Sequence, residues 1–469
     1  MVAQRGKGNS VSVQEQIARE SLMRLKFELV LPRLATFWPE QYFENRIGNT
    51  LTIKKPYKAR VSRGRHLWDP AGSGNLHSDR SAGWNPLIDE NVTISVDNTY
   101  NFWMEWSAWE ATLDINQLYD RYFKAGIEQL GYRYDALGGE ELAFAIHATE
   151  GTTGTGLTQD QIPLIRAHAA EIGLPRGMDS FGVFNEYDSA VLQADLGGAA
   201  GQGGKYNEGI VREAIERDRI GMYSGFDCFN SIHVPSQRVR KVSGLTAPAV
   251  QGALHDNGST VRTDGWGVNS EKVLYKGQLI QIAGVGEVFD RSYEGFVENS
   301  GIGPNSDPSK RPTGRSKTFT VTADVTTNST GEADIPISPR INDGGLNIQD
   351  EDNGNVSLAA FANVTAGPAD NAQVTIVGLP SGSSDVAYRQ NVFFHRSALA
   401  YVPVQLAEPD ANVRHWKATD EATNLSVDIV SDYNINERKE IVRADVLFGV
   451  KNIYPELGVR HWGSQEGSF

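Results

Sequence analysis

The glycine-rich segment GGAAGQGGK, residues 197–205, is the first candidate for chemistry because its composition is that of a phosphate-binding loop. Such a loop reads Gly, four residues, Gly-Lys, then Ser or Thr, since backbone N–H groups and the lysine hold the phosphates and the hydroxyl meets magnesium. Counted back from Gly204-Lys205, the first position holds Ala199, and Tyr206 follows the lysine. No buried apolar strand leads into the segment. The sequence therefore favours a surface loop over a nucleotide site.

The single cysteine, Cys228, lies five residues before His233 in the segment GFDCFNSIH, next to Asp227. A thiol nucleophile needs a base that raises its thiolate content and a third group that orients the base. Spacing along the chain does not establish that geometry, and a lone cysteine is more often a small buried hydrophobe. One cysteine also excludes an internal disulfide and multi-cysteine metal sites. We predict a structural role for Cys228.

An acidic cluster, made by Asp343, Asp350, Glu351 and Asp352, lies within residues 342–355 among several glycines. Calcium binds oxygen-rich loops, but the calcium-loop register fails here. With Gly354 as the turn glycine, Gln349 would come first and Ala360 last. The pattern favours a solvated loop, and metal binding by it stays open. Since no other motif fits, we predict no catalytic, cofactor-binding or metal-ligating residues.

Three tryptophans, Trp103, Trp106 and Trp109, are spaced by three residues. Exposed aromatic rings could stack on sugar rings or bases. On a helix, however, this spacing keeps the rings on one face, as in a buried stripe. We therefore expect core packing on a helix that covers residues 102–150. Asp114 is its candidate cap, and an apolar stripe runs from Ile115 to Leu130.

The N-terminal third of the chain has two further expected elements. Ser12 and Glu15 have the capping-box spacing, and apolar residues at helical spacing follow, so we predict a helix over 13–30 that ends before Pro32. Residues 51–54 and 92–96 alternate like half-buried strands around a polar stretch, 60–85. We therefore predict that residues 47–100 form two paired strands joined by a long loop.

The remaining segments are mixed, then β-rich. We expect a helix over 160–172 with Asp160 as N-cap and Gly173 as its end, a buried strand over 180–184, and a helix over 208–217. Between 242 and 385, short strands alternate with turns, which predicts an inserted all-β barrel or sandwich. The expected strands there and in the tail cover residues 273–275, 279–282, 319–322, 373–377, 392–394, 425–432 and 441–450.

Composition and charge limit the class of protein. The 469 residues are 39% hydrophobic and 22% charged, as in a folded soluble chain, with no apolar run long enough to cross a membrane and no expected secretory signal. The net charge is −14. Residues 1–70 nevertheless hold 13 Lys and Arg against 6 Asp and Glu. An acidic body argues against a dedicated nucleic-acid reader. The basic first segment could meet acidic partners.

The order of several segments is what identifies a resemblance. Seven segments carry it: LVLPRL at 29–34, IGNTLTIKKP at 47–56, Asp114 to Leu142, SFGVFN at 180–185, GFD at 225–227, RQNVFFH at 389–395, and GVKNIYPELGV at 449–459. In this order the chain resembles the major coat protein of P22-type short-tailed double-stranded-DNA bacteriophages, which have the HK97-like capsid fold.

The resemblance implies an α+β tailed-phage major-capsid fold. In such a fold, residues 1–46 would form an N-terminal arm and residues 47–101 an extended loop that reaches a neighbouring subunit. Residues 102–241 would hold the spine helix with segments of the peripheral and axial domains. Residues 242–388 would be an inserted β domain, and residues 389–469 the return strands of the axial and peripheral domains.

The resemblance also implies a function. The chain would be no enzyme but a coat protein that self-assembles into hexamers and pentamers of an icosahedral shell around packaged double-stranded DNA. Its expected partners are itself, a separate scaffolding protein, a portal protein and, as a further candidate, a decoration protein, with DNA held without sequence-specific contacts and no membrane. The coat protein would assemble in the host cytoplasm and would be found in the capsid shell of the virion. The alternative is a virion-associated carbohydrate-binding or hydrolytic protein, which needs a cleft with convergent carboxylates.

Overall fold

A computed structural model of the chain describes residues 23, 29–37, 50–55, 91–107, 124–175, 177, 179–196, 220–252, 258–289, 312–343, 347–350, 354–357, 362–382, 384–407, 414–419 and 425–468. The chain divides into two compact units, each built from segments far apart in sequence. The first unit takes residues 1–53, 92–141 and 396–453, and the second takes 54–91, 142–395 and 454–469. No helix in the described ranges is long and apolar enough to cross a membrane.

The first unit is built on a six-stranded sheet with the order β1-β21-β24-β23-β22, and β4 pairs with β24. Its strands are β1 (Thr36–Phe37), β4 (Asn98–Ser107), β21 (Leu399–Val404), β22 (Arg414–Thr419), β23 (Ser426–Asn434) and β24 (Lys439–Asn452). The strands predicted over 425–432 and 441–450 are thereby confirmed. A separate two-stranded sheet joins β2 (Thr50–Lys54) to β3 (Asn91–Ser95), which confirms the predicted strand pair.

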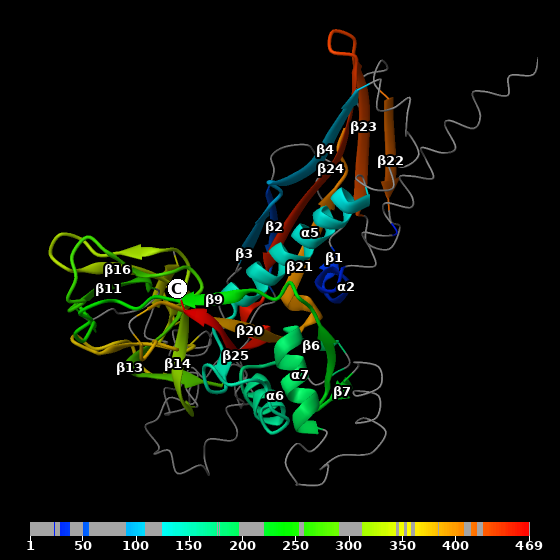
Figure 1. The fold of residues 1–469 in the computed structure, drawn as a ribbon. Coiled ribbons are helices and arrows are strands. Elements are labelled where there is room, and N and C mark those ends of the chain that lie inside the picture. The colour runs from blue at the N-terminus through cyan, green and yellow to red at the C-terminus, as the bar shows by residue number, and fades with distance from the viewer. Residues whose placement is uncertain are drawn as a thin grey trace, which may run out of the picture. The chain divides into compact units, whose positions relative to one another are not determined.

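Helix α5 (Lys124–Ala145) lies along this sheet (Figure 1). Tyr134 of α5 stacks on Tyr401 with 4.9 Å between ring centroids, and its edge meets Phe448 at 4.3 Å. The short helix α2 (Leu31–Leu34) joins this packing, because the Leu31 N–H donates to Asp135 Oδ1 at 2.8 Å. Its proline sits in the first turn, where a missing N–H breaks no helical hydrogen bond. Most of the helix predicted over 13–30 lies outside the described residues.

The prediction of a helix over 102–150 is wrong at both ends, because residues 98–107 form strand β4 and α5 ends at Ala145, before strand β5 (Thr149–Glu150). β4 runs antiparallel to β24 from Asn98, opposite Phe448, to Ser107, opposite Lys439. Aromatic residues favour strands, and residues three apart on a strand face opposite sides of the sheet. Trp103 is accordingly 60% exposed and is not part of a core stripe. Trp109 and Asp114 lie outside the described residues.

The second unit contains a seven-stranded sheet with the order β5-β25-β20-β6-β8-β7, and β9 pairs with β20. Its strands are β5 (Thr149–Glu150), β6 (Ser180–Phe184), β7 (Gly221–Tyr223), β8 (Phe226–Asn230), β9 (Ser236–Val239), β20 (Val386–His395) and β25 (Gly458–Ser468). The buried strand predicted over 180–184 is β6. The short 3-10 helices η5 (Arg396–Ala398) and η6 (Pro455–Leu457) precede β21 and β25.

Two helices of the second unit connect strands of this sheet. Helix α6 (Gln161–Glu171) confirms the helix predicted over 160–172, and Gly173 follows it with a φ of 104°. Asp160 makes no capping hydrogen bond from its side chain. Gln161 instead accepts the Thr158 N–H through its side chain at 3.1 Å. Helix α7 (Glu186–Leu196) was not predicted, and the expected helix over 208–217 lies outside the described ranges.

A second six-stranded sheet lies between β9 and β20 along the chain, with the order β10-β11-β16-β14-β13-β19 (Figure 1). Its strands are β10 (Ala249–Val250), β11 (Gly258–Asp264), β13 (Leu279–Val288), β14 (Pro312–Val321), β16 (Ala333–Ile341) and β19 (Val374–Ile376). Two small pairs accompany it: β12 (Lys272–Leu274) with β15 (Val325–Thr326), and β17 (Asn347–Asp350) with β18 (Gly354–Ser357). Its hydrophobic core includes Trp266 and Phe319, and Trp462 of β25 joins it.

Candidate functional site

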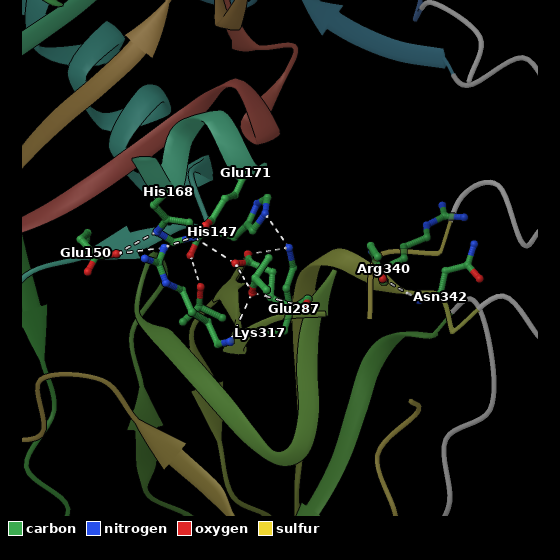
Figure 2. A network of polar contacts seen from close by, with 12 residues as sticks. His147, Glu150, His168, Glu171, Glu287, Lys317, Arg340 and Asn342 are labelled. Atoms are coloured by element: carbon green, nitrogen blue, oxygen red, sulfur yellow. Dashed lines mark hydrogen bonds and ion pairs between the residues drawn. The ribbon is translucent and has the colours of Figure 1, made fainter. Parts of the chain in front are cut away.

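Seven ionisable side chains of the second unit meet in one network, here called the charged network: His147, Glu150, His168, Glu171, Glu287, Arg315 and Lys317. They come from the α5–β5 connection, β5, α6, β13 and β14. In Figure 2 the labelled members of the charged network, which are all of them except Arg315, point toward one another. The charged network therefore joins the β13–β14 sheet to the layer of β5 and α6.

His168 of α6 is the centre of the charged network. Its Nε2 lies 3.0 Å from Glu287 Oε2, and its Nδ1 lies 3.1 Å from Glu150 Oε2. The side chains of His168 and Glu287 are only 4% and 2% exposed. An imidazole placed between two carboxylates can satisfy both only as an imidazolium, because both nitrogens then donate.

Two cations of β14 complete the charge balance. Lys317 Nζ lies 3.3 Å from Glu287 Oε1. Arg315 Nη1 lies 3.3 Å from Glu150 Oε2 and 3.4 Å from Glu171 Oε2. With His168 protonated, the charged network holds three carboxylates and three cations and is neutral overall.

His147 is the neutral member of the charged network. Its Nε2 lies 3.2 Å from Lys317 Nζ, and because an ammonium only donates, this nitrogen accepts. Burial and the Lys317 charge lower the pKa of His147 well below its usual range. The backbone of the same segment is also tied to β14, since Thr320 Oγ1 donates to the Ile146 carbonyl at 3.1 Å.

Glu287 and Glu150 are stabilised in their ionised forms. Burial opposes the charge of Glu287, but the hydrogen bond from His168 and the Lys317 charge outweigh it and lower its pKa to about 2. Burial likewise opposes the charge of Glu150, and His168 and Arg315 lower its pKa overall. Burial alone would lower the pKa of His168, but its close contacts with the Glu150 and Glu287 carboxylates raise it.

The chemistry available here is ion pairing between layers. No group of three or more His, Cys, Asp or Glu side chains in the described part of the chain could hold a metal ion. In the charged network, Arg315 pairs with Glu150 and Lys317 with Glu287. The arrangement fixes one sheet against another.

Arg460 of β25 makes a second connection between the same layers. Its side chain is fully buried, and both Nη1 and Nη2 lie 3.0 Å from the Gly277 carbonyl in the turn before β13. Its Nε has no hydrogen-bond partner among the described residues. Burial lowers the pKa of Arg460 to about 9. The guanidinium also lies 5.5 Å from the Trp462 ring centroid.

Asp385 makes a third connection, where the chain passes into and out of the second six-stranded sheet. Its carboxylate accepts hydrogen bonds from Arg238 Nε at 3.1 Å, from the Lys241 N–H at 2.9 Å and from the Tyr275 hydroxyl at 3.1 Å. Beside it, β9 pairs with β20 from Val239 opposite Val386 onward. Residues 240–385 thus begin and end on a two-stranded stem.

Of the residues singled out in the sequence, only some fall within the described ranges. Cys228 is buried in β8, and burial followed by the Asp227 charge raises its pKa to about 12, so the thiol stays protonated. The prediction of a structural role fits this environment. The glycine-rich segment 197–205 with Tyr206, and Glu351 and Asp352 of the acidic cluster, lie outside the described residues.

Trp103 has no pair of unoccupied carboxylates beside it among the described residues. On the same face of the sheet, Glu105 pairs with Lys439 at 2.9 Å, and Asp445 pairs with Arg443 at 2.7 Å. Glycoside hydrolysis needs two carboxyl groups directed at one bond. These neighbours of Trp103 do not support the hydrolytic alternative.

A family model described as "P22 coat protein - gene protein 5" matches residues 59–463, more than four-fifths of the chain. Among curated proteins, none matches. Solved structures with a similar course of chain include Mycobacterium phage Che8, at 12% identity and a TM-score of 0.43, covering 92% of this chain and 90% of that one. The capsid of cyanophage P-SCSP1u has 9% identity and a TM-score of 0.38, covering 92% and 88%. The capsid of Helicobacter pylori bacteriophage KHP30 has 10% identity and a TM-score of 0.35, covering 92% and 89%.

Proposed function

The chain belongs to the P22 coat protein family, and on that premise we propose that it forms the hexamers and pentamers of an icosahedral shell around packaged double-stranded DNA. The main support for this function is the family match over residues 59–463. The protein is a major capsid protein and a structural component of the phage virion. Its mechanism is binding, because many weak contacts between subunits add up once they act together.

We propose that residues 242–388 form an inserted β domain of this subunit. Three observations support these limits: the pairing of β9 with β20, the hydrogen bonds that converge on Asp385, and a hydrophobic core drawn mainly from residues between Val239 and Tyr388. The charged network and Arg460 would then fasten the domain to the rest of the second unit.

We propose that residues 1–46 act as an arm and residues 47–101 as an extended loop that contacts a neighbouring subunit. The β2–β3 pair supports the second assignment, because two short strands would hold the base of a long excursion. The charge of residues 1–70, with 13 Lys and Arg against 6 Asp and Glu, suits contacts with the acidic remainder of another copy.

A scaffolding protein, a portal protein and a decoration protein are the further partners we propose, with DNA as cargo. The net charge of −14 supports encapsidation without specific DNA binding, because an acidic surface does not gather phosphates. A separate scaffolding protein would bring the subunits together and leave the shell.

Co-expression with the neighbouring phage genes tests this function. Velocity sedimentation should find most of the chain in large closed particles, whereas the chain expressed alone should give subunits or irregular aggregates. If the chain sediments only as monomers or small oligomers even with a scaffolding protein present, the proposed shell is wrong.

A further inference from the structure

With its three carboxylates ionised and His147 neutral, the charged network is neutral only when His168 carries a proton. Glu150, Glu171 and Glu287 supply three negative charges, and Arg315 and Lys317 supply two positive ones. The third positive charge has to come from His168. Without it, the ring still faces Glu150 Oε2 at 3.1 Å and Glu287 Oε2 at 3.0 Å but has one proton for two carboxylates. One lone pair would then face a carboxylate inside the protein.

We propose that the charged network is a proton-dependent clamp, in which one proton on His168 holds the β13–β14 sheet against β5 and α6. The proposal goes beyond shell formation, because it concerns how firmly two layers of one subunit are joined. With the proton in place, His168 ties Glu150 of β5 to Glu287 of β13. Without it, the charged network carries one excess negative charge, and part of that charge lies on the buried Glu287, where it is costly.

Each element that carries the charged network contributes a charged or titratable group, and His461 of β25, which also packs on α6, feels the Glu150 charge. β5 brings Glu150, β13 brings Glu287, β14 brings Lys317 and Arg315, and α6 itself adds Glu171. His147 faces the site from the α5–β5 connection, and Lys55 acts on His147 through its charge. Because His147 is held neutral, His168 is the histidine of the charged network whose charge matters for the balance.

The direction of the pH effect follows from the two carboxylates. They raise the pKa of His168 above its ordinary value of 6.5, so the clamp is complete below that value and is lost as pH rises through the folded-state pKa. Glu287, with a pKa of about 2, limits the clamp only in strong acid. We therefore expect a clamp that is closed below about pH 6.5 and opens as the pH rises above that value.

Hydrogen exchange on full-length unassembled subunits tests the proposal. Peptides from 279–288 and 312–321 should lose protection at least tenfold as pH rises from about 6 to about 9, after correction for the intrinsic pH dependence of exchange. Peptides from β23 and β24 of the first unit should not. If the corrected protection of residues 279–288 and 312–321 in the wild-type chain is the same at about pH 6 as at about pH 9, the proposal is overturned.

A pair of glutamate variants tests whether His168 is the group that titrates. Glu150→Gln removes a carboxylate that touches His168 and should move the midpoint of the protection loss to lower pH by about one unit. Glu171→Gln is the matched control, because Glu171 also faces Arg315 but forms no ion pair with His168. If the midpoint stays in place in Glu150→Gln, or moves as far in Glu171→Gln, the proposal fails.

Histidine variants provide an independent check. His168→Gln should abolish the pH dependence, leaving low protection at both pH values. His461→Gln should retain it, because burial lowers the pKa of His461 to about 4, so this ring is neutral over the tested range. Its side chain hydrogen-bonds Gln161, and only the Glu150 charge of the charged network acts on it. An unchanged alkaline loss in His168→Gln would contradict the proposal. If His168→Gln does not fold, the glutamate pair still decides the question in folded chains.

Discussion

Gly138 of α5 offers a sharp test of how the helix packs on the first unit's sheet. A Cβ at this position would overlap the hydroxyl of Tyr401, whose side chain is fully buried. Replacing glycine by alanine inside a helix normally stabilises by about 1 kcal/mol. Overpacking a closed core costs up to about 3 kcal/mol. We therefore expect Gly138→Ala to destabilise the subunit by about 2 kcal/mol, against the helix preference.

The assay is urea unfolding of unassembled full-length subunits, with the midpoint of the transition as the readout. Tyr401→Phe removes the overlapping oxygen and loses only a long hydrogen bond to the Tyr134 carbonyl, at 3.4 Å. When Tyr401→Phe is already present, Gly138→Ala should cost at least about 1 kcal/mol less, as a double-mutant cycle would measure. A Gly138→Ala variant that is more stable than wild type, or one with the same cost whether or not Tyr401→Phe is present, would refute the packing described here.

Three further predictions concern charge. Lys317→Met leaves the buried Glu287 with one cation fewer and should destabilise by about 3–5 kcal/mol in thermal unfolding, with much of the loss recovered in Lys317→Met/Glu287→Leu. The low pKa of Glu287, about 2, means that its contribution to stability is present above about pH 4.5 and is lost as pH falls toward 2. In Glu287→Gln, the free energy of unfolding should therefore fall less steeply between about pH 4.5 and pH 2. An unchanged fall would show that Glu287 does not contribute in this way. Shell assembly followed by light scattering should slow between about 0.05 and 0.5 M salt if the basic residues 1–70 steer it; a rate indifferent to salt would contradict that.

The spacing of apolar residues along the chain predicted those strands and helices whose sequence fits only one type of secondary structure. Strands such as β6, β13 and β24 were visible because their residues alternate or run apolar over the expected length. Helix α6 was visible from its spacing and the glycine that ends it. β4 was misread because the Trp103–Trp106 spacing fits a helical face, while the alternation of exposed Trp103 and Glu105 with half-buried Phe102 and Met104 fits a strand. Pairing with β24 decides between the two.

The charged network could not be predicted from the sequence, because its members are far apart along the chain. His168 lies 119 residues from Glu287, and His147 lies 170 residues from Lys317. No local motif has such separations. The strands gave a weak signal. Lys317 lies on the same strand face as the buried Phe319, and Glu287 lies on the same strand face as the buried Val285. A charge on the core-facing side of a strand calls for a buried partner, but which partner depends on the topology.

The central claim is that this chain builds an icosahedral shell, and cryo-electron microscopy of particles purified after co-expression with a scaffolding protein tests it most directly. We predict closed shells in which this chain forms both six-fold and five-fold capsomers, with the β2–β3 loop of one subunit reaching its neighbour. Particles whose lattice is made of another protein, with this chain absent or present only at a few sites, would contradict the claim.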